Sequence, residues 1–174
     1  SFSSTVDSTS DGSKALTINA GSGIVTFTGA VGNTYRLDTT AITAGSTVVS
    51  STFKVGSSAN LTFTTDLISF GGAVSGSSSG LLTIRPQTTG RTIGIGSSAA
   101  GDLALSDTTL TNISTGFSGI VIGGNTSTYT GAITQDYGSG FTTFALPLTI
   151  QNNSGGITAN DALNTGTNSL TISS

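Results

Sequence analysis

The tripeptide Leu-Thr-Ile occurs four times, and its spacing limits the possible folds more than any other feature of the chain. The copies begin at Leu16, Leu82, Leu148 and Leu170. Successive starts are separated by about three, three and one times a common period of roughly 22 residues, and a fixed period of roughly 20 to 50 residues is typical of proteins built from stacked repeats. The spacing therefore predicts a β-solenoid with about 22 residues per coil.

The same period predicts where the remaining coils begin. It places them at Leu37-Asp38-Thr39, Leu61-Thr62-Phe63 and Leu103-Ala104-Leu105, with a poor match at Thr126-Ser127-Thr128. Successive side chains of a strand point to opposite faces, so we expect the Leu and Ile of each Leu-Thr-Ile copy inside and the Thr outside. About eight coils, each about 4.8 Å thick, would form a rod about 38 Å long.

Composition favours strands and tight turns over helices. Only 7% of the residues are charged and 34% are hydrophobic, and the chain has 8 Phe but no Trp. The abundant Thr, Val and Ile favour strands, while Ser and Gly favour turns. A net charge of -3 is too small for charge-driven disorder. Small apolar side chains suit the thin core of a solenoid, although a sandwich or jelly roll remains the structural alternative.

Further short strands and their boundaries can be predicted from alternation and turn residues. Alternating apolar residues predict strands at residues 24–28, 52–55, 92–95, 120–122 and 141–146. Pro86 should end the strand before it, and Pro147 should precede the next one, since proline cannot donate within a ladder. Seven asparagines lie at predicted corners, where Asn tolerates left-handed geometry and can bond along the stack: Asn19, Asn33, Asn60, Asn125, Asn152, Asn153 and Asn160. No composition break divides the chain, so we expect one domain over residues 1–174.

The chain lacks features that exported precursors carry at their start. It contains no Met and no Cys, and it opens without a basic and then apolar signal segment. We therefore expect it to be cut from a longer exported precursor. No stretch approaches the roughly 20 apolar residues that span a bilayer, so we expect no membrane insertion by this segment.

Three segments resemble repeat modules of filamentous-haemagglutinin-like and autotransporter-type bacterial surface proteins. They are residues 13–33 (SKALTINAGSGIVTFTGAVGN), 99–124 (AAGDLALSDTTLTNISTGFSGIVIGG) and 155–174 (GGITANDALNTGTNSLTISS). The resemblance implies a right-handed parallel β-helix that is exported across the outer membrane. It also implies a place at the bacterial cell surface or in the extracellular matrix, with a role in adhesion, biofilm or sheath formation. These modules share no catalytic residues, so none is carried over.

The residue types argue against an enzyme, a cofactor or a metal site. The chain has no His and no Cys, which removes the commonest general base and metal ligand and all thiolate chemistry. A polysaccharide-cleaving β-helix needs two or three converging carboxylates. The acids here are scattered beside turn residues: Asp7, Asp11, Asp38, Asp66, Asp102, Asp107, Asp136 and Asp161. Asp102 and Asp107 are the nearest candidates for a pair, but residues 101–107 lack the Gly-Gly-x-Gly-x-Asp calcium pattern.

The remaining hypotheses concern partners. Nucleic acid is not expected, because the five basic residues are outnumbered by acids and Arg85 and Arg91 offer only a small basic spot. Glycan binding would need some of the three tyrosines, Tyr35, Tyr129 and Tyr137, on one face.

Ice binding would need ranks of outward Thr. The Thr-x-Thr units that begin at Thr26, Thr62, Thr109 and Thr126 do not keep one period. Outward Thr is then explained by the preference of strands for it.

The leading hypothesis is a structural rod or filament body. Its end strand at Leu170 has no predicted cap, so we expect end-to-end stacking with itself or with sister repeats.

Overall fold

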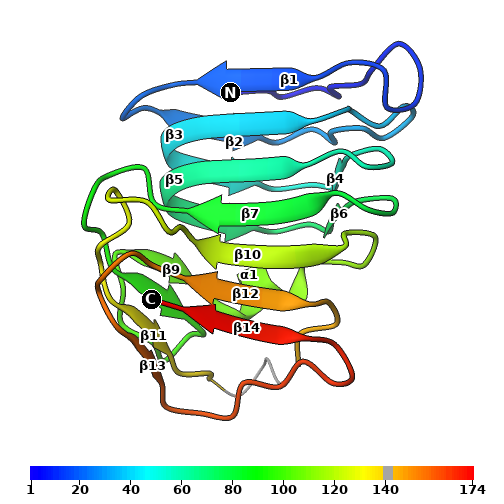
Figure 1. Cartoon of the computed structure of the whole chain (residues 1–174). Coiled ribbons are helices and arrows are strands. Elements are labelled where there is room, and N and C mark those ends of the chain that lie inside the picture. The colour runs from blue at the N-terminus through cyan, green and yellow to red at the C-terminus, as the bar shows by residue number, and fades with distance from the viewer. Residues whose placement is uncertain (139–142) are drawn as a thin grey trace.

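The computed structural model describes residues 1–138 and 143–174 and shows an all-β fold with parallel sheets (Figure 1). All strand pairs in this described part are parallel, as expected. The main sheet runs in the order β1 (Leu16–Asn19), β3 (Thr40–Val49), β5 (Leu61–Phe70), β7 (Leu81–Arg85), β10 (Gly119–Gly123), β12 (Leu148–Gln151) and β14 (Leu170–Ser173). We call each of these strands, with the residues up to the next, a rung.

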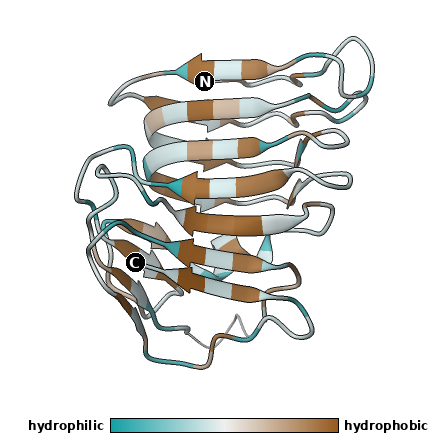
Figure 2. Ribbon diagram, in the orientation of Figure 1, coloured by the Kyte–Doolittle hydropathy of each residue, from teal (hydrophilic) through white to brown (hydrophobic). Residues whose placement is uncertain are grey.

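The four Leu-Thr-Ile copies share one register across the main sheet, which confirms that part of the sequence prediction. The column that they define contains Leu16, Thr40, Leu61, Leu82, Ile120, Leu148 and Leu170. Leu82 is fully buried and Leu148 is only 1% exposed, while Thr83 and Thr149 face outward and are partly exposed. Figure 2 shows brown hydrophobic bands separated by pale bands of intermediate hydropathy along most strands of this sheet, while β10, which has Val121 in the middle position, is brown throughout its apolar part.

The end rungs differ from the inner ones. Leu16 and Ile18 of β1 are half-buried. Leu170 and Ile172 of β14 are 38% and 51% exposed. These side chains point in the same direction as their buried counterparts, but among the described strands each end strand has a partner on one side only. Inward orientation therefore produces burial only where a rung lies on both sides.

The constant coil length predicted from the sequence is wrong for part of the chain. Residue 82 pairs with residue 120, which is 38 positions further on, and residue 120 pairs with residue 148. The main sheet consequently has seven successive strands where eight coils were predicted. The long interval contains additional strands and a helix, so the chain takes a detour before it returns to register.

Three predicted coil starts are corrected by the structure, and one is right. The start at Leu61 is correct. The strand predicted at Leu37 begins instead at Thr40, because Leu37 is buried and bridges to Val55 elsewhere in the fold. Residues 103–105 form a strand, but one that belongs to the second sheet. Residues 126–128 form a turn, and the rung lies at residues 119–123.

Two ten-residue strands, β3 and β5, build the thickest part of the core. Their first halves lie in the Leu-Thr-Ile column, and the second half of β3 pairs with β2 (Ile24–Phe27). Two short strands, β4 (Phe53–Lys54) and β6 (Val74–Ser75), pair separately. Successive rungs thus present several strands around a shared interior, with β2 and β4 behind the main column in Figure 1.

Phenylalanine side chains fill this interior. Phe27, Phe53, Phe63 and Phe70 are at most 1% exposed. Their ring centroids follow one another at 5.2, 5.8 and 5.3 Å. Phe2 stacks on Phe27 at 4.9 Å and extends the series toward the N-terminal end. Burying each such side chain stabilises the fold by about 1.5–3 kcal/mol.

The second sheet lies beside the C-terminal rungs. Its order is β13 (Ile157–Ala159), β11 (Ile133–Gln135), β8 (Ile93–Ile95) and β9 (Leu103–Leu105). The short helix α1 (Asp107–Thr111), which we did not predict, follows β9, and the Ser106 side chain caps it by accepting from the Thr109 amide. The strand predicted at 141–146 is wrong over residues 143–146, and its first two residues lie outside the described ranges.

Proline and asparagine roles are partly as expected. β7 ends at Arg85, directly before Pro86, and β12 starts directly after Pro147. No asparagine in the described ranges uses its tolerance of left-handed geometry, because Ser58 is the only non-glycine residue with positive φ there. Asparagine does bond along the stack: the Asn60 side chain accepts from the Leu81 amide 2.9 Å away. No helix within the described ranges is long and apolar enough to cross a membrane.

Candidate interaction surfaces

The middle residues of the Leu-Thr-Ile triplets form an outward column along the main sheet. By register the column contains Thr17, Ala41, Thr62, Thr83, Val121, Thr149 and Thr171. It therefore holds five threonines and no charged residue. Parallel strands lie about 4.8 Å apart, so threonine hydroxyl and methyl groups recur at that spacing where threonines are adjacent, in the pairs Thr62 with Thr83 and Thr149 with Thr171, while Ala41 and Val121 interrupt the hydroxyl series. The column is an uncharged stripe of small side chains, all of them partly or fully exposed.

The neighbouring outward column contains one charged residue. Asn19, Thr43, Thr64 and Arg85 follow one another there. The Arg85 Nε donates to the Thr64 hydroxyl 3.1 Å away, and its guanidinium lies 5.5 Å from the centre of the Tyr129 ring. Arg85 thus belongs to this second column and stands two residues from Thr83 on the same outward face, while the first column itself contains no charged residue.

The Thr-x-Thr units noted in the sequence do not form this surface together. The unit at Thr62 lies on β5 within the column. The other three begin in β2 at Thr26, in α1 at Thr109 and in a turn at Thr126. The prediction that they keep no common period is confirmed. The threonine column comes instead mainly from the middle residues of the Leu-Thr-Ile copies.

Aspartates fasten the turns of adjacent rungs to one another. Asp7 accepts from the Thr34 amide at 3.1 Å and Asp11 from the Arg36 amide at 2.8 Å. Asp161 accepts from the Tyr137 amide at 2.8 Å. These partners are 24 to 27 residues away, which is about one rung. The predicted turn role is therefore correct in place, but the bonds reach the neighbouring turn.

Asp66 and Asp102 meet at Arg91. Arg91 Nε lies 3.7 Å from an Asp66 oxygen, and its Nη1 lies 3.2 Å from Asp102 Oδ1. Asp66, which is 8% exposed, also accepts from the amides of Gln87 and Thr88 at 2.9 and 2.8 Å. The structure thus places Asp102 with Asp66 at one arginine, whereas the sequence suggested Asp107 as its partner.

The surroundings of Asp102 hold its carboxylate in the charged form. Its Oδ2 accepts from the amide and the hydroxyl of Thr92 at 3.1 and 2.9 Å. The Thr92 amide lowers the pKa of Asp102 most, followed by the Thr92 hydroxyl, and the Arg91 charge lowers it further. General acid catalysis needs a carboxyl that retains its proton. Asp102 is therefore suited to fastening the loop and not to donating a proton.

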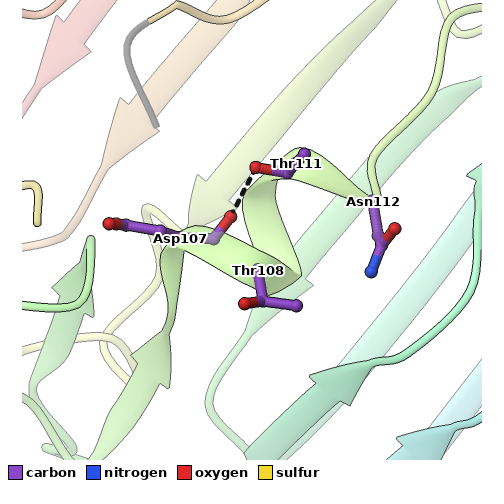
Figure 3. A pocket seen from close by; sticks show the side chains of 4 residues that line it. All are labelled: Asp107, Thr108, Thr111 and Asn112. Carbon is purple, nitrogen blue, oxygen red and sulfur yellow. Dashed lines mark hydrogen bonds between the residues drawn. The ribbon is translucent and has the colours of Figure 1, made fainter. Parts of the chain in front are cut away.

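Asp107 lines a small cavity of about 190 Å³ together with Thr108, Thr111 and Asn112 (Figure 3). Asp107 Oδ1 accepts from the Ser97 amide at 2.9 Å. The Asn112 side chain donates to the Phe70 carbonyl at 2.6 Å, and the Thr111 hydroxyl donates to the Asp107 carbonyl at 2.8 Å. Most ligand pockets measure roughly 300–1,000 Å³. The polar groups of this smaller cavity are largely used to hold the fold.

The tyrosines occupy three different environments. Tyr35 is 45% exposed, and Tyr129 lies against Arg85. Tyr137 packs on Phe144 with ring centroids 6.5 Å apart. Burial raises the pKa of Tyr137 to about 12, and the nearby charges of Asp161 and Asp107 add to the effect. No two of these rings are in contact within the described ranges, so they form no joint aromatic platform there.

The last candidate surfaces are the two uncovered strand edges. Among the described residues, 1–138 and 143–174, β14 pairs only with β12, and β1 pairs only with β3. Within the described residues, α1 is the one helix, and it packs against β5 in the middle of the molecule. Both end strands therefore present free backbone groups and inward apolar side chains.

Comparison of the chain with protein-family models, with curated proteins and with solved structures finds no match. The resemblance to bacterial surface repeats accordingly stays a prediction. Within the described ranges no group of three His, Cys, Asp or Glu side chains could hold a metal ion.

Proposed function

We propose that the chain is a structural module: a single right-handed β-solenoid segment, with about 22 residues in each regular coil, that acts as a rigid rod or filament body. Its setting would be a secreted bacterial surface or extracellular fibre, in adhesion, sheath or biofilm matrix. The single observation that carries the proposal is the seven-strand column in which all four Leu-Thr-Ile copies share one register. In such a stack, the length of the molecule is set by the number of repeats.

The use of polar side chains supports this proposal over an enzyme. Asp7, Asp11, Asp66 and Asp161 bind backbone amides of other turns, and Asp102 binds Thr92 and Arg91. A catalytic pair would instead present carboxylates to an open cleft with their pKa values driven apart. Here the carboxylates serve the stack itself.

Duplicating one rung tests the proposal. Residues 61–81 cover the interval from Leu61 to Leu82, which are paired neighbours in the column. Inserting a second copy of residues 61–81 after residue 81 should give a folded protein that is longer by one strand spacing, about 4.8 Å, with unchanged cross-section. Small-angle X-ray scattering measures both dimensions. A matched insertion of the same segment in scrambled order should disrupt the fold.

A swollen or unfolded product of the ordered duplication would contradict the rod proposal. Turnover of a polysaccharide that disappears on changing one aspartate would contradict it in a second way, because a purely structural module has no such activity. A panel of glycans offered to the immobilised chain separates the rod from a glycan-binding adhesin module. The rod proposal expects no saturable binding.

The threonine column favours one second candidate function, binding to ice. A flat surface with hydroxyl and methyl groups at one spacing and no charge can match ordered water better than a charged surface can. The column of five threonines is the observation that supports it.

The test is inhibition of ice recrystallisation by the intact chain. Thr83→Lys and Thr149→Lys should abolish it, and Thr26→Lys on β2 is the control outside the column. Inhibition that survives both column variants, or no inhibition by the parent chain, would exclude this function.

A further inference from the structure

We propose that β14 pairs in parallel with β1 of a second copy of the chain, with Leu170 opposite Leu16, Thr171 opposite Thr17 and Ile172 opposite Ile18. The inference rests on the proposed function and names its partner, its strand and its register. Its basis is a strand pairing that the molecule already makes.

The internal pair β12·β14 is the template for the proposed joint. Leu148, Thr149 and Ile150 lie opposite Leu170, Thr171 and Ile172 in that order. β1 carries the same tripeptide, and it pairs with β3 in the same register of the main sheet. A strand with the sequence of β1, placed on the open side of β14, therefore meets the side-chain pattern that β12 presents on the other side.

The exposed apolar side chains of β14 supply the driving force. Leu170 and Ile172 are 38% and 51% exposed, whereas their partners Leu148 and Ile150 are 1% and 0% exposed. Leu16 of β1 is only half-buried. Adding a rung would bring the end residues toward the burial of the inner ones, and the stabilisation grows with the apolar surface removed from water.

Neither strand carries a feature that protects an edge. Natural edge strands avoid association through lysines, prolines, bulges or a covering element. β1 (LTIN) and β14 (LTIS) contain no charged residue and no proline. The fourth position would place Ser173 opposite Asn19, and both of these side chains are polar and exposed. The two edges are therefore compatible along the whole length of the strand.

The geometry of the joint leads to open filaments. β1 and β14 lie at opposite ends of the main sheet (Figure 1). A contact between two different surfaces of the same molecule is head-to-tail, and it produces a filament when its rotation does not close a ring. Each added copy presents a new β14 edge, so the reaction continues.

The first test compares two lysine variants of the same strand in the polypeptide of residues 1–174. That polypeptide is specified because residues following Ser174 in any longer chain would compete for the same edge. Ile172→Lys places a charge inside the joint and should weaken association by about 100-fold or more, since an unpaired buried charge is strongly unfavourable. Thr171→Lys points outward and should assemble like the parent. Sedimentation velocity over a concentration series and electron microscopy give the readout.

The second test determines the register by disulfide formation between introduced cysteines. The chain has no native cysteine that could form competing disulfides. Thr17→Cys mixed with Thr171→Cys should cross-link, because directly opposed residues fall within the Cα separation of about 4.4–6.8 Å that a disulfide needs. Asn19→Cys mixed with Thr171→Cys is two residues out of register and should cross-link at least about tenfold less. The double variant Thr17→Cys, Thr171→Cys should give a ladder of multimers.

Three outcomes would overturn the inference. The first is a parent chain that stays monomeric at high concentration. The second is Thr171→Cys cross-linking on its own, which would mean that two β14 strands meet. The third is equal cross-linking by the in-register and out-of-register mixtures. If the rung duplication still yields a longer folded monomer in these cases, the rod proposal survives and only the head-to-tail joint fails.

Discussion

Replacing Leu82 with alanine should cost about 3–4 kcal/mol of unfolding free energy. Leu82 is fully buried and lies between Leu61 and Ile120 of the adjacent rungs. Buried Leu-to-Ala changes cost about 2.7–5 kcal/mol, depending on how far the surroundings collapse into the cavity. Collapse is limited here, because the ladder hydrogen bonds fix the spacing of the strands above and below.

The chain offers its own control for this change. Leu170 belongs to the same tripeptide and the same column, but it is 38% exposed and has a rung on one side only. Leu170→Ala should cost about 1 kcal/mol, in proportion to the smaller apolar area that it buries. The difference between the two variants therefore measures the second neighbouring rung.

Urea titration followed by far-UV circular dichroism gives both unfolding free energies. The measurement is made at concentrations below those of any assembly, and with unchanged m-values the shift in midpoint reports stability alone. Equal losses for the two variants would refute the reasoning, because the burial of a Leu-Thr-Ile leucine would then not depend on its place in the stack. A loss near zero for Leu82→Ala would refute the register itself.

Three further predictions concern backbone packing and titration. Gly72→Ala should lower stability by about 1–3 kcal/mol in thermal unfolding, because its new Cβ would lie 2.5 Å from the Ser51 carbonyl. The control Gly71→Ala should be almost neutral, since its new Cβ would have nothing nearer than 3.6 Å. Equal losses of stability in the two variants would contradict the close approach at Gly72. The pKa of Asp102 lies below its ordinary 3.8, so the stability advantage of the parent over Asp102→Asn should be complete above pH 3.8 and should disappear as the pH falls through the lowered pKa. A stability advantage that does not change with acid pH would contradict the lowered pKa. The pKa of Tyr137 is raised from 10.0 to about 12, so its contribution should be intact below pH 10 and lost as the pH rises toward 12. Tyr137→Phe should remove that alkaline loss, about 1 kcal/mol after allowance for solvent screening, and an unchanged alkaline profile would show that the ring is not responsible.

The alternation of apolar and polar residues predicted where strands lie better than it predicted which strands pair with one another. Residues 103–105 have two fully buried leucines and an exposed alanine between them, as the alternation indicated. Their partner is nevertheless β8 and not the Leu-Thr-Ile column. Whether a side chain points into the core depends on its position in the strand, whereas the pairing of strands depends on the length of the segment that connects them. The segment between Arg85 and Gly119 carries no sequence signal for that length.

The polar sites show the same limit. Most Asp and Asn residues lie in the turns and connections between strands, as predicted, but Asn19 lies in β1, Asp66 in β5 and Asp107 in α1. Several of these side chains bind an amide about one rung away, as Asn60 does with Leu81 at the start of β7, 21 residues further on. Only a known rung length reveals such partners. The Arg91 cluster could not be found at all, because it depends on the detour that returns Asp102 to the corner at Asp66.

The pairing of each main-sheet strand with only its immediate neighbours also sets how the molecule would respond to force. A pull applied at its two ends should load the strand pairing of an end rung first, since no described strand of the main sheet pairs with distant rungs. The stack should then peel apart one rung at a time. The interval between Leu61 and Leu82 would release about 70 Å of chain, and the longer interval between Leu82 and Ile120 about 130 Å. Intervals of unequal length should thus give the molecule a stepped extension under tension, with the longest step released between Leu82 and Ile120.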